Sequence, residues 1–470
     1  MRLLLAGLLL TCGCRQLLGL DDLPGDAGHD ARVVLDADPS RLALTRVTPS
    51  RISEGIGSSS RPAVLVVEGM HIVPGATVEI TVANGGRGFT VDSTKIQVSR
   101  DGTMLAFPMT VEPDATLAAG ARLQLDVTVT QETGMGPVSK TLGEMLEIVG
   151  LDELTGSVAL SPGVHEYSTV DASTLTAANP AGGPIMIRSM STVTLGGITS
   201  VNGSGQTGGA GGGNGGAGGP AIGGAGQPGM GPGAGLPSGG GGSYGTRGGG
   251  NAPDPVGNPA LPTLEMPNRG SGGAGGNANG TPNPGGAGGG GGGTIEITAN
   301  GAVVLSTIQA RGGNGTVAGA DDGGGGSGGT ILLRGASIQL QSIDVSGGLG
   351  LNAGGVGRIR IDAPGSIPAM DPPAYRGPTF DAETPLITTT AKPEISAHGQ
   401  PLTTFSYFFT TAKGDQLRGP FQATFGSTGL ATFTLDDSLF EGLDLVCLLV
   451  DGGEIERAES RNCVDIAYLF

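Results

Sequence analysis

The sequence contains no tryptophan, and aromatic residues make up only 3% of its 470 residues. We therefore expect its cores to consist of Val, Ile and Leu. Hydrophobic residues still account for 37% of the chain, so aliphatic cores are possible if the 93 glycines are concentrated in a few places. Val, Ile and Leu in short alternating runs favour β-structure. These features predict an all-β protein of several domains.

Clusters of Lys or Arg are also missing, and the net charge is −17. A chain of this charge repels phosphate backbones, so no nucleic-acid partner is expected. Neither H-E-x-x-H nor C-x-x-C occurs, and the four histidines, at 29, 71, 165 and 398, are scattered over different segments. We therefore predict no metal and no cofactor.

Catalysis on polysaccharides would need paired carboxylates. The candidates Glu296, Asp344 and Asp362 fall at three different positions of a unit that is repeated within residues 151–367, so we do not expect them to converge. Asp321 and Asp322 are adjacent in a glycine-rich loop, where acidic turn residues are common. The prediction is that the protein is not an enzyme.

The first residues, "MRLLLAGLLLTCGC", place an apolar run from Leu3 to Leu10 after Arg2. The run is far shorter than the ~20 residues of a membrane-spanning helix and has the form of a secretory signal. It resembles a bacterial lipoprotein signal, which implies that a cysteine becomes the lipidated first residue. Gly13 favours Cys14 over Cys12, and an ordinary signal peptide is the alternative. We assign residues 1–14 to the signal and 15–41 to an acidic, disordered tether.

Residues 42–150 have short strand-like runs separated by turn residues, as in an antiparallel sandwich. Their "VTPSRISEGIGSSSRPAVLVVEGMHIVPGATVEI" resembles the IPT/TIG type of immunoglobulin-like domain. The resemblance implies a spacer or interaction module and transfers no functional residue.

Residues 151–367 contain a repeated unit, read as strand, turn, strand and a third short strand, and the glycine blocks separate its copies. Stacked copies would bury aliphatic columns and predict a glycine-rich, parallel β-helix-like solenoid. A flattened sheet sandwich of the same units is the rival. The expected columns are Ile185, Ile295, Ile331 and Ile359; Ile187, Ile297, Leu333 and Ile361; Val193, Val303 and Ile338; Leu195, Leu305 and Leu340; and Ile198, Ile308 and Ile343.

The glycine blocks are predicted to be excursions between coils, at residues 203–293, 312–329 and 347–357. We expect the insertion 203–293 to be mainly flexible coil, because glycine loses the most entropy on ordering. The alternative is a stack of extended, polyproline-II-like glycine strands. The "NAPDPVGNPALPTLEMPN" segment at 251–268 favours the coil.

Residues 368–384 are predicted to be a Pro-rich linker, and 385–470 a C-terminal β-sandwich. Cys447 and Cys463 fall on its last two predicted strands, around a turn. In an exported protein this placement predicts a disulfide across a hairpin.

The lipobox-like cysteine, the TIG-like domain, the glycine-interrupted strands and the paired cysteines together resemble bacterial surface lipoproteins of myxobacterial style. The resemblance implies a location, the outer membrane or cell surface, where a lipid anchor would contact the membrane. We predict a structural or adhesive protein whose partners are extracellular polysaccharide or surface proteins. The alternative is a β-helix protein that binds or cleaves polysaccharide, although Tyr244 is the only aromatic residue between 184 and 367.

Overall fold

A computed structural model describes residues 41–56, 62–82, 89–113, 117–178, 182–255, 270–278, 283–318, 321–365, 367, 369–381, 384–450 and 462–470. Within them the protein is all-β, as the sequence predicts. The chain forms two compact units. The first combines the residues up to Asp152 with Thr379–Phe470, and the second is Glu153–Pro378.

The N-terminal part of the first unit has two sheets that share one mainly aliphatic core, which includes Leu65, Phe107 and Val127. One sheet has the order β1-β3-β7-β5, with β6 paired to β7, and the other has the order β2-β9-β8-β4. The elements are β1 (Ala43–Thr48), β2 (Arg51–Ser53), β3 (Ala63–Met70), β4 (Thr77–Val82), β5 (Phe89–Val91), the 3-10 helix η2 (Ser93–Lys95), β6 (Gln97–Val98), β7 (Met104–Val111), β8 (Arg122–Thr133) and β9 (Gly136–Val149).

The C-terminal part of the first unit also has two sheets, in the orders β21-β23-β26 and β22-β28-β27-β24-β25. The expectation of cores made of Val, Ile and Leu is wrong here, because Phe405, Tyr407 and Phe409 on one strand pack against further aromatic rings. The strands are β21 (Thr379–Phe380), β22 (Ile387–Thr388), β23 (Glu394–His398), β24 (Thr404–Thr411), β25 (Leu417–Thr424), β26 (Leu430–Thr434), β27 (Gly442–Val450) and β28 (Cys463–Tyr468).

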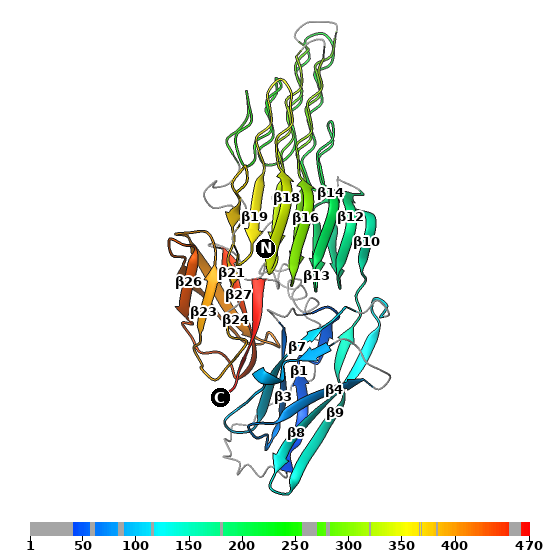
Figure 1. Cartoon of the computed structure of the whole chain (residues 1–470). Helices are drawn as coiled ribbons and strands as arrows, with labels where there is room; N and C mark the ends of the chain where they lie inside the picture. The colour runs from blue at the N-terminus through cyan, green and yellow to red at the C-terminus, as the bar shows by residue number, and fades with distance from the viewer. Residues whose placement is uncertain are drawn as a thin grey trace, which may run out of the picture. The chain divides into compact units, whose positions relative to one another are not determined.

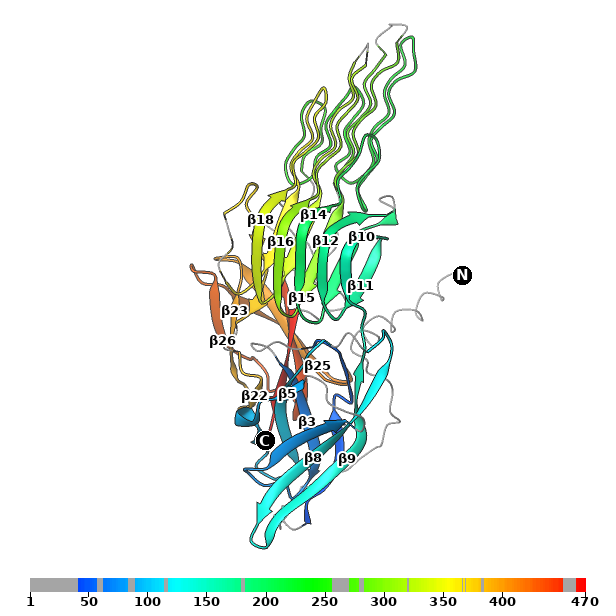
Figure 2. The same cartoon turned by 45° about the vertical axis from the view of Figure 1, so that its right-hand side comes forward.

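The second unit has two sheets in which every strand pairing is parallel (Figures 1 and 2). One has the order β10-β12-β14-β16-β18 and the other β11-β13-β15-β17-β19-β20, so each repeat adds one strand to each sheet. The strands are β10 (Leu154–Leu160), β11 (Gly163–Tyr167), β12 (Val170–Ala177), β13 (Ile185–Ser189), β14 (Val193–Ser200), β15 (Thr294–Ala299), β16 (Ala302–Gln309), β17 (Thr330–Arg334), β18 (Ser337–Asp344), β19 (Arg358–Asp362) and β20 (Tyr375–Arg376).

The register of these sheets reproduces the first four predicted columns, for example Ile187 opposite Ile297, which in turn lies opposite Leu333. The fifth column is wrong at Ile198, which pairs with Thr307 and is 52% exposed. The ladder shifts between Leu195 and Ile198. In this interval β14 has one residue more than β16. The extra residue reverses the face on which the later residues of β14 lie, so Thr199 takes the buried place opposite Ile308.

The prediction of a third strand in each repeat is also wrong, because the last two predicted strands form one continuous strand. In β14, for example, a single strand runs from Val193 to Ser200 across the register shift. The repeat therefore builds two sheets rather than three.

Candidate functional site: the glycine bundle

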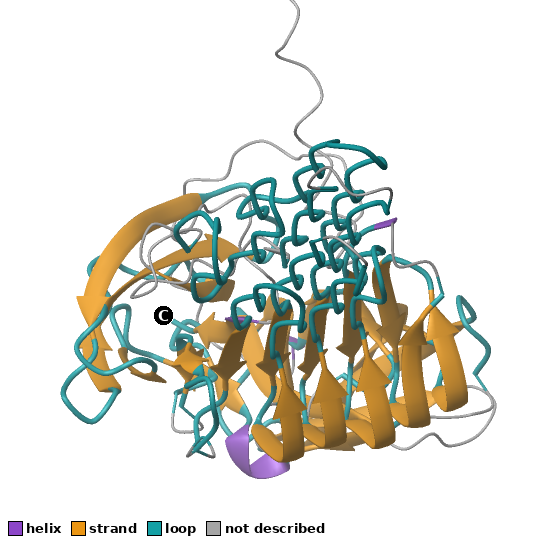
Figure 3. Cartoon of the chain, turned by 90° about the horizontal axis from the view of Figure 1, so that it is seen from above, coloured by secondary structure: helices purple, strands orange, loops and turns teal. Residues whose placement is uncertain are grey.

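The glycine-rich excursions of the second unit lie side by side as extended strands beyond the ends of the sheets (Figure 1; seen from above in Figure 3). We call the described parts of residues 203–293, 312–329 and 347–357 the glycine bundle. Its strands are joined by backbone hydrogen bonds with a spacing of three residues. The amides of Gly213, Gly216 and Gly219 donate to the carbonyls of Gly270, Gly273 and Gly276 over 2.8–2.9 Å.

The same spacing recurs between the other strands of the bundle. In an antiparallel pair, the amides of Gly270, Gly273 and Gly276 donate to the carbonyls of Gly292, Gly289 and Gly286. In a parallel pair, the amides of Gly286, Gly289 and Gly292 donate to the carbonyls of Asp321, Gly324 and Ser327. A polyproline-II strand has three residues per turn, rises about 3.1 Å per residue and has no internal hydrogen bonds. Its amides are free to bond neighbouring strands, as they do here.

Burial along one outer strand follows the same period. Gly213, Gly216 and Gly219 are buried, whereas Asn214, Ala217 and Pro220 are exposed. A Cβ on Gly216 would collide with the carbonyl oxygen of Gln227. Glycine is required at the buried position because a neighbouring backbone occupies the space of a side chain.

The expectation of flexible coil for residues 203–293 is therefore wrong for the described residues, and the stack of extended strands is the observed arrangement. Residues 256–269, which include most of the segment that favoured coil, lie outside the described residues. The signal is present in the sequence as a period of three in the non-glycine positions, such as Ser271, Ala274 and Asn277. Glycine content alone conceals it.

Tyr244 connects the bundle to the sheets below it. Its ring is fully buried, its hydroxyl lies 2.7 Å from Oγ1 of Thr330 at the start of β17, and the guanidinium of Arg358 lies over the ring, 4.8 Å from its centre. Burial raises the pKa of Tyr244 to about 12. Because the ring is enclosed, it offers no face on which a sugar could stack.

The surface of the bundle combines large apolar side chains with little charge. Among its described residues the charged ones are Arg247, Asp254, Asp321 and Asp322. The exposed apolar residues are Ile222 (79%), Met230 (62%), Leu236 (50%), Val317 (86%), Leu349 (69%) and Leu351 (50%). Two of them belong to the segment 347–357 and contact other parts of the bundle: Leu351 packs on Gly239, and Leu349 donates its amide to the Asn314 side chain.

The carboxylates considered for catalysis have structural partners. Asp362 is fully buried and accepts hydrogen bonds from Arg334 and Arg360. Burial disfavours its charge, but the two guanidiniums outweigh burial and lower the pKa of Asp362. Glu296 lies on the same sheet beside Thr298, whereas Asp344 lies in the other sheet, 3.2 Å from Arg311. Oδ1 of Asp322 accepts the amide of Ala318, and Asp321 lies half-buried next to it.

The expectation that the chain has no Gly-x-Ser-x-Gly motif, the type found around nucleophilic serines, is wrong: the motif occurs twice, around Ser243 and Ser327. Both are fully buried inside the bundle. Their hydroxyls donate to the carbonyls of Pro253 and Ser271, respectively. In this setting they bridge glycine strands.

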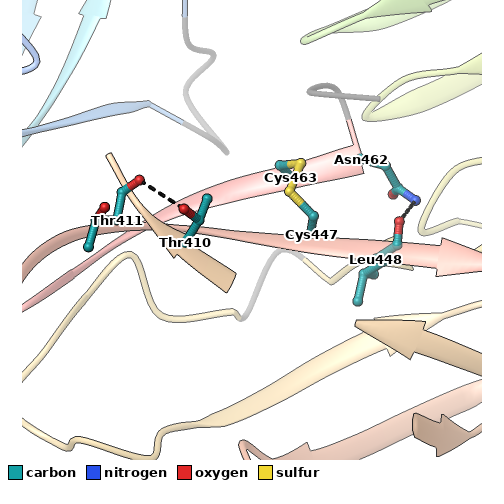
Figure 4. The surroundings of a disulfide bond; sticks show 6 residues. All are labelled: Thr410, Thr411, Cys447, Leu448, Asn462 and Cys463. Atoms are coloured by element: carbon teal, nitrogen blue, oxygen red, sulfur yellow. Dashed lines mark hydrogen bonds between the residues drawn. A yellow bond between two sulfur atoms is a disulfide. The ribbon is translucent and has the colours of Figure 1, made fainter. Parts of the chain in front are cut away.

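The sulfur atoms of Cys447 and Cys463 lie at disulfide distance, on directly opposite residues of β27 and β28 (Figure 4). Next to them Nδ2 of Asn462 donates to the carbonyl of Leu448 over 2.7 Å. The predicted lipidation residues, Cys14 and Cys12, lie outside the described residues.

Among the histidines, His398 lies 2.9 Å from Asp381, and Nε2 of His165 lies 2.7 Å from the carbonyl oxygen of Ser161. In the ranges that the structure describes, no three His, Cys, Asp or Glu side chains are grouped closely enough to hold a metal ion. The described part of the chain also has no helix with the length and apolar character needed to cross a bilayer.

Comparison with known proteins gives no relative. No family model, curated protein or solved structure matches the chain.

Proposed function

We propose that this chain is a non-catalytic structural or adhesive protein of the cell surface, and that the glycine bundle is its contact element. The bundle itself carries this proposal. Backbone hydrogen bonds hold its strands without bulky side chains, and large apolar residues such as Val317 and Leu349 are exposed on it. Exposed apolar side chains that gather in one patch are typical of surfaces that bind other molecules.

We further propose the finer fold assignments. Residues 42–150 are an immunoglobulin-like sandwich of the IPT/TIG type, 151–367 a β-helix-like solenoid flattened to two sheets, and 385–470 a second sandwich. The parallel ladders and the aliphatic columns of the second unit support the solenoid. The rule that stacked repeats bury a continuous core supports it as well.

A lipid anchor at Cys14 would place this protein on the outer membrane or cell surface. The support is the apolar run before Cys14 and the cysteine pair at disulfide distance, which suits an oxidising compartment. Replacing Cys14 with Ser should move the protein from the membrane fraction to the soluble fraction. Continued membrane association, together with a wild-type mass that lacks acyl chains, would contradict the anchor.

The adhesive role is tested by binding of the labelled mature chain to bacterial cells, to isolated extracellular matrix and to polysaccharide-coated beads. The variant Leu349→Asp/Leu351→Asp places charge on the exposed apolar residues and should reduce retention at least tenfold. Val304→Asp/Ser306→Asp adds the same charge on β16 and serves as the control. Equal retention of both variants, or cleavage of any polysaccharide, would contradict the proposal.

A further inference from the structure

Four chain reversals in the described part of the glycine bundle lie near its end away from the sheets (Figures 1 and 2). A row of backbone hydrogen bonds close to this end joins four strands, through Gly219, Gly276, Gly286 and Asp321. The four reversals lie next to this row. We call their described residues the distal turns: 220–223, 236–239, 317–322 and 349–353.

Hydrogen bonds hold the distal turns to one another. Nδ2 of Asn277 donates to Oγ of Ser238 over 2.7 Å, and the carbonyl of Asn277 accepts the amide of Asp321. Nδ2 of Asn352 donates to the carbonyl of Gly239 over 2.9 Å. The distal turns therefore form one surface, although they come from separate parts of the chain.

The exposed apolar side chains of the bundle gather on this surface. Of the six in its described part, five belong to the distal turns: Ile222, Leu236, Val317, Leu349 and Leu351. The charged residues of the distal turns, within the described positions, are Asp321 and Asp322. The surface is thus apolar and acidic.

Two of the distal turns share a backbone conformation but not a side chain. Ile222 has φ 69° and is followed by Gly223 with φ 75°, whereas Ser238 has φ 80° and is followed by Gly239 with φ 73°. Two consecutive positive φ values are typical of a type I′ turn, which favours Asn-Gly. Ser238 suits such a turn, because it is small and its hydroxyl accepts a hydrogen bond from Asn277.

Ile222 does not suit this conformation. A β-branched residue rarely adopts positive φ, because its side chain crowds the backbone. The side chain of Ile222 is also 79% exposed, so its burial offsets little of that strain. Strain that the fold itself does not use is typical of functional positions.

We propose that the distal turns are the part of the bundle that binds a partner, with Ile222 as the principal contact. The partner is a protein with an apolar pocket bordered by Lys or Arg. This inference rests on the proposed role of the bundle as the contact element. A rigid turn that presents one large apolar side chain can fill such a pocket, and Asp321 and Asp322 would face the basic border.

The chemistry of the distal turns disfavours other partners. Sugar rings stack on aromatic side chains, and none occurs among the described residues of the distal turns. A bilayer that took up Val317 would also have to take up the neighbouring Asp321 and Asp322, which is costly. Both objections are absent for a protein partner, whose surface can match apolar and acidic groups side by side.

The test measures retention of the labelled mature chain, without its lipid, on isolated extracellular matrix. Ile222→Asn removes the apolar side chain and supplies the residue that a type I′ turn favours. Retention should fall about tenfold or more, as for a principal contact residue. The bundle should remain intact, so the amides of Gly216 and Gly219 should exchange no faster than in the wild type.

Two further variants are controls. Ile222→Val keeps a β-branched apolar side chain and should be retained nearly as well as the wild type. Met230→Asn removes another exposed apolar residue, which lies at the opposite end of the same hairpin, where Met230 donates its amide to Asn214. This variant should be retained like the wild type.

Equal losses in Ile222→Asn and Met230→Asn would overturn the assignment to the distal turns. Full retention of Ile222→Asn would overturn the role of Ile222. In that case Leu349→Asp/Leu351→Asp separates the two proposals. If this variant still binds weakly, the bundle remains the contact element and only the role of Ile222 fails. If it binds fully, the proposed function fails as well.

The class of partner is tested on the same matrix. Digestion of the matrix with a protease should abolish retention of the wild type. Raising NaCl from about 0.05 M to about 0.5 M should weaken retention, because salt screens the pairing of Asp321 and Asp322 with basic residues. Retention that survives digestion, or Ile222-dependent binding to polysaccharide-coated beads or to phosphatidylcholine vesicles, would overturn the protein partner.

Discussion

The sheets and the glycine bundle of the second unit are stabilised in different ways. In the sheets, aliphatic side chains such as Ile297 and Leu305 form columns that exclude water. In the bundle, most buried positions have no side chain, and backbone hydrogen bonds repeat every third residue. The sheets therefore depend on large buried aliphatic side chains, whereas the bundle depends on buried positions that carry no side chain. A substitution that is harmless in one region should damage the other.

The largest effect is expected in the sheets. Ile297→Asp buries an unpaired carboxylate in a column whose members are fully buried, and should cost about 3 kcal/mol or more. Thermal unfolding followed by circular dichroism should show the second unit melting early. Val304→Asp, on an outward position of β16, should melt like the wild type. Equal melting of both variants would mean that the columns do not hold the sheets.

The first unit provides a contrast, because a buried carboxyl group in it has a raised pKa, whereas the pKa of the buried Asp362 in the second unit is lowered. Burial raises the pKa of Asp444, which has no exposed surface, to about 8. This value lies above the unfolded value of about 4, so the folded state favours the protonated form. The contribution of Asp444 to the unfolding free energy should be highest below pH 4. It should fall as the pH rises from 4 to 8 and stay low above pH 8.

Replacing Asp444 with Asn should remove that fall and stabilise the first unit by a few kcal/mol at pH 9. Denaturant unfolding of the two proteins at pH 5 and pH 9 measures it. The sparsely charged bundle should unfold with the same free energy at both pH values. A pH-independent first unit would show that Asp444 is solvated.

A smaller, local effect is expected in the bundle. Gly216→Val forces side-chain atoms against the carbonyl of Gln227 and should cost about 2 kcal/mol, as overpacking does. Its control is Ala217→Val, one residue further along the chain, where the side chain is exposed. Mass-spectrometric hydrogen exchange should show faster exchange of the bundle in the first variant only. If both variants exchange alike, the close approach of the strands is not what orders them.

The smallest effect concerns the connection between the two regions. Tyr244→Phe removes the hydroxyl that lies 2.7 Å from Thr330 and keeps the ring beneath Arg358. Loss of one buried hydrogen bond should lower the unfolding free energy by about 1 kcal/mol. Denaturant titration measures the change. A loss several times larger would mean that the hydroxyl organises more of the junction than this bond.

The sequence predicts the sheets better than the bundle, for a physical reason. Aliphatic columns produce a strong pattern, so Ile187, Ile297 and Leu333 can be aligned from the amino-acid sequence alone. A bulge is invisible in such a pattern, so the same alignment wrongly places Ile198 inside. The prediction of coil for the bundle is wrong because high glycine content is shared by disordered chains. Only the spacing of residues such as Asn214 and Ala217 distinguishes ordered glycine strands from coil.

The contacts of Tyr244 and Asp362 could not be predicted from the sequence either. Tyr244 is recognisable in the sequence as an isolated aromatic, but its enclosure depends on strands far apart in the chain. The pairing of Asp362 with Arg334 depends on the parallel register of β17 and β19, in which the two residues are opposite each other. Such contacts cannot be found from spacing along the sequence when glycine excursions of very different length separate the repeats.

The glycine bundle is an ordered structure held by backbone hydrogen bonds of period three, and residue-resolved hydrogen exchange by NMR tests this most directly. We predict that the amides of Gly213, Gly216 and Gly219 exchange at least about a thousandfold more slowly than in an unfolded chain, because each donates to a neighbouring strand. Exchange of all three at the unfolded rate, while the amides of β15 and β17 stay protected, would contradict it.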